Sequence, residues 1–168
     1  MSKKLKTKKK PIITDTSPLL LLLIGSYDKN TIKGFKRLAK YDSVDFDLLL
    51  DFVAKSKVMV TPQVLAEVSN FAKELKNNPD TFSEIIEKNK AMLEKICEKY
   101  TPKNDILGSQ ELIKFGFTDA SIIIAAKEND ALVLTDDFPL WGICKKNGLD
   151  TKHMKEIQEM KEIFDKSF

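Results

Sequence analysis

The sequence predicts an α/β fold built on a mainly parallel sheet. Short runs rich in β-branched and aliphatic residues occur at 11–14, 57–61 and 131–135, and each has the composition of a buried strand. Longer stretches with apolar residues at helical spacing lie between these runs. Strands that alternate with helices favour parallel pairing, because a parallel pair needs a long crossover connection. The 168 residues have the length of one domain with a sizeable core.

The first run, residues 11–14, predicts a strand that ends at Asp15. A helix start follows at 16–18 (TSP), with a hydroxyl cap and proline at the first helical position. Residues 19–24 are apolar on all sides, so this helix is expected to be buried. We expect it to end at 25–26 (GS).

Two further helices are indicated at 31–41 and 45–55, where apolar residues form one stripe each. The strand at 57–61 is followed by a helix that opens at Pro62. The sequence Asn-Asn-Pro at 77–79 is expected to break that helix.

The second half of the chain continues the alternation. A long amphipathic helix is predicted at 81–100, with a solvated face of Glu and Lys at i,i+4 spacing. The remaining predicted elements are a short helix or turn at 112–117, an apolar helix at 120–127 capped by Thr118 and Asp119, the strand at 131–135, a helix at 138–146, a weak strand that begins at Leu149, and a terminal helix at 154–164.

The net charge of +3 is unevenly distributed along the chain. Six lysines lie within residues 1–10, and removing their charges leaves a body of net −3. We therefore expect a disordered Lys-rich tail at 1–10, followed by a single domain at 11–168. The tail and the apolar run at 18–24 resemble the start of a signal peptide, but no small-x-small cleavage site follows the run. This run is also too short to span a membrane. Two cysteines without a CxxC motif fit a reduced, cytoplasmic setting.

Several acids occupy positions at which α/β proteins hold active sites. Asp15 ends the first strand, and Asp136 and Asp137 follow the third. Asp119 lies at the start of an apolar helix, and Glu67 lies on the helix after the second strand. The carboxyl ends of parallel strands meet at one edge of a sheet, so we expect these acids to converge there. The alternative role for Asp119 is to cap its own helix.

Carboxylates gathered in one pocket repel each other and take up protons unless cations neutralise them. Mg²⁺ or Mn²⁺ is the natural partner, because hard divalent ions prefer oxygen ligands. Such ions activate water and stabilise the charge that develops on a phosphodiester, so the acids indicate metal-assisted phosphodiester hydrolysis. The single histidine, His153, argues against a multi-histidine metal site, and the sequence has no GxGxxG or GxxxxGK[ST] motif.

The order and context of four segments resemble a PIN-domain nuclease. The segments are IITDTSPLLL at 12–21, TPQVLAEVSN at 61–70, GFTDASIIIAA at 116–126 and LVLTDDFPL at 132–140. Their acids are Asp15, Glu67, Asp119 and, by the pattern of Thr, one residue and Asp, Asp137. Asp136 is the local alternative for the fourth acid, and the sequence leaves this choice open.

The resemblance spans residues 11 to about 150 and implies a three-layer α/β/α sandwich. It implies that Mg²⁺ or Mn²⁺ binds to the four acids, directly or through water, and that an activated water cleaves RNA, single-stranded or structured, as an endoribonuclease. Many bacterial and archaeal members are toxins of toxin–antitoxin pairs, so an antitoxin protein is an expected partner. A homo-oligomer is left open, and no membrane association is expected. The longer helical stretch at 25–55 and the Lys-rich tail depart from the compact toxin type.

Three further residues are candidates to position the acids. Thr16 can hold Asp15, and Thr135 can position the loop of the fourth acid through its hydroxyl. Asn70 lies at i+3 from Glu67 and therefore on the same helix face. Each has a structural alternative, namely a helix cap for Thr16, a strand-forming residue for Thr135 and a surface residue for Asn70.

Two other functions remain open from the sequence. A catalytically silent PIN-like RNA-binding or interaction module would bind RNA through the tail without metal-dependent turnover. A phosphoacceptor regulator or phosphohydrolase would need a second acid two residues after Asp15, where Ser17 stands, or a partner Lys near a strand end.

Overall fold

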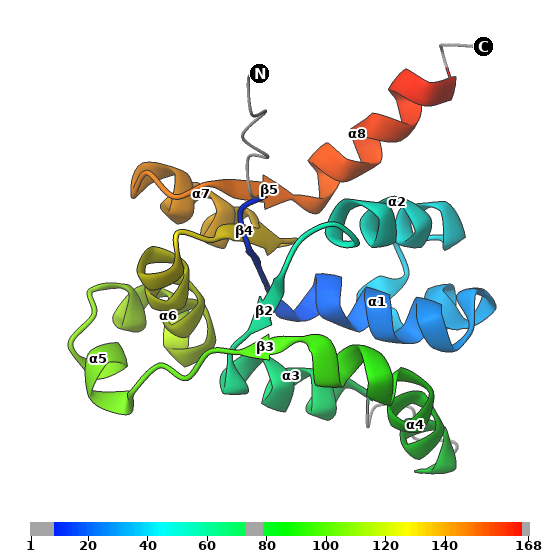
Figure 1. Ribbon diagram of the computed structural model, residues 1–168, viewed down its shortest axis with the longest axis horizontal. Coiled ribbons are helices and arrows are strands. Elements are labelled where there is room, and N and C mark those ends of the chain that lie inside the picture. The colour runs from blue at the N-terminus through cyan, green and yellow to red at the C-terminus, as the bar shows by residue number, and fades with distance from the viewer. Residues whose placement is uncertain (1–8, 73–78, 166–168) are drawn as a thin grey trace, which may run out of the picture.

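The computed structural model describes residues 9–72 and 79–165, and it has the predicted α/β architecture. One five-stranded sheet has the order β3-β2-β1-β4-β5, and every described pairing within it is parallel. Helices cover both faces, which makes the domain a three-layer α/β/α sandwich (Figure 1). The strands are β1 Ile12–Thr14, β2 Val58–Val60, β3 Cys97–Glu98, β4 Leu132–Thr135 and β5 Thr151–His153.

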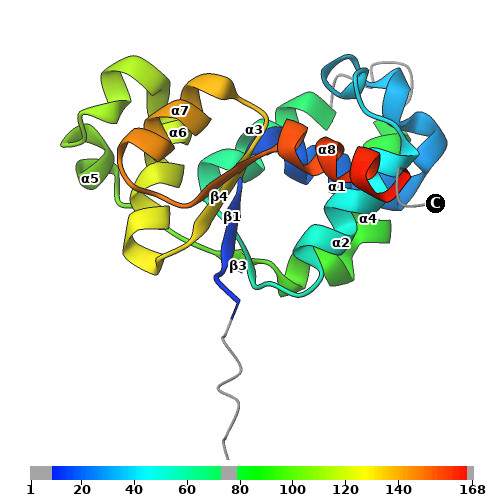
Figure 2. The ribbon, with the colours of Figure 1, turned by 90° about the horizontal axis from the view of Figure 1, so that it is seen from above.

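The two outer layers consist of different helices. Figure 2 shows α5, α6 and α7 on one side of the sheet, and α1, α2, α4 and α8 on the other. The helix α3 packs against α1 and also contacts α6. The α-helices are α1 Thr16–Tyr27, α2 Ser43–Val53, α3 Pro62–Ala72, α4 Pro79–Lys95, α5 Lys103–Leu107, α6 Glu111–Asn129, α7 Phe138–Lys146 and α8 Met154–Asp165.

The strand order reverses direction between β1 and β4. From β1 the chain builds outward through β2 to β3, and it then returns to place β4 on the other side of β1. The ends of β1 and β4 are in register, with Thr14 opposite Leu134, and the Asp15 amide donates to the Leu134 carbonyl at 2.9 Å. Open α/β sheets form their binding crevice at such a reversal, beside the carboxyl ends of the strands.

The helix α1 is buried on all sides, as its uniformly apolar sequence predicts. Every residue from Thr16 to Gly25 is buried, and α1 is in contact with α2, α3 and α4 as well as β4. The predicted end of this helix at 25–26 is wrong, because α1 continues to Tyr27. Gly25 lies inside the helix, where the Phe46 ring from α2 packs against it so closely that an added Cβ would come within 2.2 Å of that ring.

The predicted α-helix at 31–41 is also wrong. Two short 3-10 helices occupy this segment, η1 Lys29–Gly34 and η2 Lys36–Leu38. The physical reason is the period of the apolar residues, which is three and matches the 3.0 residues per turn of a 3-10 helix. The four buried side chains of this series are Ile32, Phe35, Leu38 and Tyr41.

Two edge strands differ from the sequence-based expectation. The predicted helix at 81–100 begins at Pro79 and ends at Lys95, because Cys97 and Glu98 form β3, which the sequence analysis missed. Pairing of this two-residue strand with β2 outweighs the helical pattern around it. The weak last strand lies at Thr151–His153, two residues later than predicted.

The predicted Lys-rich tail and the predicted helix break at 77–79 are described only in part. Lys10, assigned to the tail, forms ion pairs with Asp130 at 2.7 Å and with Asp150 at 2.6 Å. Residues 1–8 of that tail lie outside the described residues, as do the two asparagines of the break predicted at 77–79.

We predict that Gly25→Ala lowers the free energy of unfolding by about 1–3 kcal/mol, because the new methyl group overpacks the contact with Phe46. Chemical denaturation followed by circular dichroism measures this change. Gly142→Ala in α7 is the matched control, since a Cβ there meets nothing within 4 Å. It should leave stability equal or slightly higher. Equal stability of the two variants would contradict the close packing of α1 on α2.

Candidate active site

A pocket of about 440 Å³ opens beside the carboxyl ends of β1 and β4, at the reversal in strand order. All five acids that the sequence analysis singled out line it. Two cations, two aromatic side chains and three small residues complete the wall. The lining residues are Asp15, Ser17, Arg37, Lys40, Glu67, Phe115, Gly116, Phe117, Thr118, Asp119, Asp136 and Asp137.

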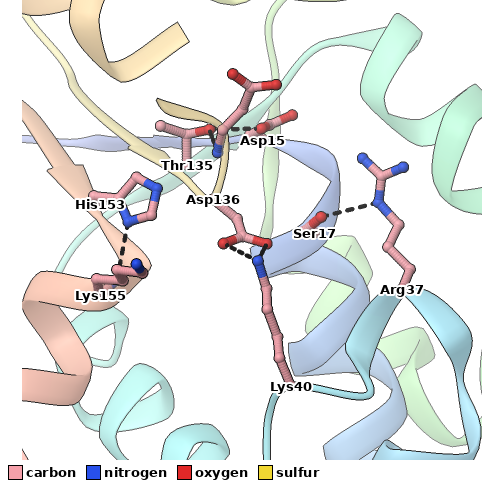
Figure 3. Close-up of polar contacts among 9 residues, drawn as sticks. Asp15, Ser17, Arg37, Lys40, Thr135, Asp136, His153 and Lys155 are labelled. Atoms are coloured by element: carbon pink, nitrogen blue, oxygen red, sulfur yellow. Dashed lines mark hydrogen bonds and ion pairs between the residues drawn. The ribbon is translucent and has the colours of Figure 1, made fainter. Parts of the chain in front are cut away.

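Asp15 is the most enclosed of these carboxylates. It directly follows β1 and caps α1, because its Oδ1 accepts the Thr16 amide at 2.6 Å. Its Oδ2 accepts the hydroxyl of Thr135 at 2.7 Å (Figure 3). Burial raises the pKa of Asp15, and these two hydrogen bonds and Arg37 only partly oppose that effect. The predicted hydroxyl cap at 16–18 is wrong, since an acid of the pocket occupies the cap position.

Thr135 joins the ends of the two central strands. Besides donating to Asp15, its hydroxyl accepts the backbone amide of Asp137 at 3.0 Å. One side chain therefore sets the position of the first acid and of the loop that carries the last. Thr135 is fully buried, so this hydroxyl is shielded from competing water.

The two neighbouring acids after β4 have different partners. Asp136 is bound by Lys40, whose Nζ lies 2.8 Å from its carboxylate (Figure 3). Asp137 is exposed and caps α7, with Oδ1 accepting the Leu140 amide at 3.0 Å. The charge of Asp137 raises the pKa of Asp119, so Asp137 is electrostatically coupled to the other acids.

Glu67 reaches the pocket from α3 and is held by two hydroxyl groups. Thr16 donates to its Oε2 at 2.9 Å, and Thr118 donates to its Oε1. Thr16 thus contacts Asp15 through its amide and Glu67 through its side chain. Asn70, three residues further along α3, is exposed and is not among the residues that line the pocket, so it does not hold Glu67.

Asp119 enters the pocket from α6 because that helix is interrupted. Gly116 has φ +83° and ψ 179°, a conformation that glycine adopts most readily, and the chain restarts the helix beyond it. The short helix or turn predicted at 112–117 and the helix predicted at 120–127 correspond to the two halves of this element. Burial raises the pKa of Asp119 to about 7, and the charges of Asp15, Asp137 and Glu67 contribute to that rise.

These acids suit a hard divalent cation by their chemistry, since they are oxygen donors whose mutual repulsion a cation would relieve. Their geometry is not that of a preformed metal centre. Within residues 9–72 and 79–165, no group of three or more His, Cys, Asp or Glu side chains is placed to hold a metal ion. Cation binding would therefore require the side chains to move from the hydrogen bonds described here.

Three polar residues that surround the acids were not predicted from the sequence. Arg37, Lys40 and Thr118 all line the pocket. The sequence contains an indication that Arg37 and Lys40 face outward. The apolar residues of this segment recur every third position, and neither cation falls in that buried series. For Thr118, only the folded chain shows that its hydroxyl reaches Glu67.

The single histidine, His153, lies outside the residues that line the pocket. His153 at the end of β5 is buried and stacks on Phe138, with ring centroids 3.9 Å apart. Its Nδ1 accepts the Lys155 amide at 3.0 Å, and burial lowers its pKa (Figure 3). It does not line the pocket, so no role in the chemistry of the acids is assigned to it.

Comparison with known proteins adds nothing on function. No protein-family model matches the chain, and no curated protein does so either. Among solved structures, the chain is similar to a domain of a functionally unknown protein from Methanocaldococcus jannaschii DSM 2661, at 18% identity and a TM-score of 0.45, over 86% of this chain and 91% of that one. The PIN-domain resemblance therefore stays a prediction from the motifs. No helix in the described part of the chain is long and apolar enough to cross a membrane.

We predict that Asp119 titrates with a pKa of about 7 and that Asp137→Asn lowers this value by removing a neighbouring negative charge. Carboxyl carbon NMR across a pH series measures both values. Asp105→Asn on α5 removes a charge from an exposed residue outside the pocket and should leave the pKa unchanged. An Asp119 that titrates near its ordinary value of about 3.9 in the unaltered protein would contradict the coupling of these acids.

The same pKa predicts how stability depends on pH. The folded protein binds the Asp119 proton more tightly than the unfolded chain, in which an Asp has a pKa of about 3.9. This contribution to stability is complete below about pH 4 and is lost as the pH rises through about 7. Asp119→Asn should flatten the decline of the urea midpoint over that range. If the urea midpoint of the variant declines as steeply as that of the unaltered protein, groups other than Asp119 cause the decline.

Proposed function

We propose that the protein is a divalent-metal-dependent ribonuclease that hydrolyses RNA phosphodiester bonds at the acidic pocket. The observation that carries this proposal is the meeting of Asp15, Glu67, Asp119 and Asp137 in one pocket at the strand reversal. Four separate segments of chain supply them, and three of them raise the pKa of the fourth. Such a concentration of negative charge, maintained against its own repulsion, is typical of sites that bind divalent cations.

The four acids would hold Mg²⁺ or Mn²⁺, with Asp136 as an additional oxygen donor. When bound, the ion supplies a Lewis acid that polarises the phosphodiester and lowers the pKa of water. Asp137 is favoured over Asp136 as the fourth acid, because its charge acts on Asp119 while Asp136 is paired with Lys40. The surroundings of the two acids thus favour Asp137, a choice that the sequence motif left open.

The residues around the acids would keep them in place for this reaction. Thr135 holds one oxygen of Asp15 and the backbone of Asp137, and Thr16 and Thr118 hold Glu67. The raised pKa of Asp119 keeps a proton on this acid to a higher pH than an ordinary Asp would keep it. A cation would displace that proton, so the apparent affinity for the metal should rise with pH.

The PIN-domain resemblance supports RNA as the substrate, and two cysteines without a CxxC motif fit the cytoplasm as the location. It also extends the proposal to the toxin of a toxin–antitoxin pair, with an antitoxin protein as partner. A small open reading frame directly upstream of the gene would support that extension, and its absence would favour a role in RNA processing.

A second candidate function is a catalytically silent PIN-like module that binds RNA or a protein. It is favoured by the side-chain geometry of the described residues, in which no three candidate ligands are placed to hold one ion. The ion pair between Lys40 and Asp136 likewise occupies one acid of the pocket. Turnover in the presence of a metal distinguishes the nuclease from this module.

We predict that Asp15→Asn and Asp119→Asn each lower the rate of RNA cleavage in Mg²⁺ or Mn²⁺ by at least about 100-fold, since each removes a charged metal ligand. Cleavage of a labelled RNA followed on a denaturing gel measures the rate, and circular dichroism checks that both variants are folded. Asp105→Asn should cleave at the rate of the unaltered protein. Unchanged cleavage in both pocket variants would refute the assignment, and a lack of cleavage in the unaltered protein would favour the silent module.

Cation binding is also expected to stabilise the fold. Mn²⁺ at about 100 times its dissociation constant should add about 2.7 kcal/mol to the free energy of unfolding. Thermal unfolding with and without Mn²⁺ measures this shift in Tm. Glu67→Gln should show a smaller shift, because it retains the hydrogen-bonding shape of the side chain but loses its charge. An equal shift in both proteins would place the ion elsewhere.

A further inference from the structure

The segment that departs most from the compact toxin type places two cations at the acidic pocket. Arg37 from η2 and Lys40, two residues after the end of η2, both line the pocket wall. They lie three positions apart, outside the buried series of η1 and η2, so the same 3-10 geometry that buries the apolar residues turns both cations outward. Nothing in the proposed chemistry of the acids uses them.

Arg37 is held in a fixed orientation by two contacts. Its Nε donates to the Oγ of Ser17 at 2.9 Å, and its guanidinium lies over the Phe71 ring, 4.1 Å from the ring centroid. The guanidinium makes no other hydrogen bond within the part of the chain that the structure describes. Figure 3 shows its two terminal nitrogens pointing away from Ser17. A planar guanidinium with two free donors matches two oxygens of a phosphate group.

Lys40 is positioned differently and retains donor capacity for a second partner. Its side chain is 58% exposed, while that of Asp136 is only 10% exposed. Breaking this ion pair would be costly, because the nearly buried carboxylate would lose its partner. The exposed ammonium has three N–H donors, so Lys40 can bind a phosphate that approaches the pocket while it stays paired with Asp136.

We propose that Arg37 and Lys40 form a phosphate-binding rim that holds the RNA backbone at the edge of the acidic pocket. In this arrangement Arg37 binds a backbone phosphate through its two free terminal nitrogens, and Lys40 binds another while it stays paired with Asp136. The inference rests on the proposed function in one respect, which is that RNA enters this pocket.

The charge of the pocket explains why such a rim is needed. Five carboxylates line the wall, and they repel a polyanion that approaches it. A bound metal offsets this repulsion at the acids only. Arg37 already offsets part of the negative charge in the pocket, since it lowers the pKa of both Asp15 and Asp119 against the effect of burial. The rim would attract the backbone just outside the region where the acids dominate.

Binding of a single-stranded RNA oligonucleotide tests the rim independently of cleavage. The full chain carries Asp119→Asn to prevent turnover, and fluorescence anisotropy in Mg²⁺ gives the Kd over a series of salt concentrations. We expect Arg37→Gln to weaken binding about 10-fold and Lys40→Gln to weaken it about 3-fold. The slope of log K against log salt should become shallower by about 0.7 for each phosphate that a variant no longer binds.

Lys33→Gln and Lys36→Gln are matched controls, because they remove the same charge from exposed residues of the same segment that do not line the pocket. Both should bind RNA like the parent protein. Arg37→Lys should recover part of the affinity that Arg37→Gln removes, since it restores the charge but not the planar pair of donors. Ser17→Ala keeps the charge of Arg37 and frees its orientation, so it should weaken binding without changing the salt slope.

If the Arg37→Gln and Lys40→Gln variants match the Lys36→Gln control in Kd and in salt slope, the proposed phosphate-binding rim is refuted.

The rim proposal and the nuclease proposal can be refuted independently of each other. If the unaltered protein cleaves RNA and the rim variants bind normally, only the rim is refuted. If the pocket acids prove irrelevant to cleavage while the rim variants still bind more weakly and with a shallower slope, only the nuclease proposal is refuted.

Discussion

The hydroxyl of Thr135 is the contact on which the arrangement of the site depends. It donates to Asp15 at the end of β1 and accepts the amide of Asp137 after β4, so it joins the two strands at the point where the sheet reverses. The backbone pairing of β1 with β4 places Asp15 beside this strand, and the Thr135 hydroxyl adds the side-chain link between the first acid and the loop of the last. Its burial matters, because a water-exposed hydroxyl would exchange these partners with solvent.

Gathering the acids in one pocket raises the pKa of two of them. Burial and mutual repulsion raise the pKa of Asp119 to about 7, and burial raises that of Asp15 as well. At Asp15 the hydroxyl of Thr135 and the amide of Thr16 oppose this rise, and the charge of Arg37 opposes it at both acids. Hydroxyl groups orient carboxylates without cancelling their charge, so the acids stay available for a cation.

The basic and acidic parts of the pocket come from different kinds of structure. The acids lie at strand ends and on helices, which the sheet and its packing place rigidly. Arg37 lies on one of two short 3-10 helices, and Lys40 lies two residues after its end; these helices pack on α1 and α2 through a single buried series. The basic character of the chain thus has two sources, since lysines of the amino-terminal segment account for its net charge while these two residues act within the pocket.

The alternation of strands and helices and the five acids of the pocket could be predicted from the sequence, because both follow from local periodicity and from the ends of apolar runs. The features that depend on contacts between distant segments emerge only in the folded chain. The strand β3 exists only through pairing with β2, and position 25 needs glycine only because the Phe46 ring lies against it. The roles of Thr118 and Arg37 likewise depend on partners 51 and 20 positions away, which no local pattern identifies.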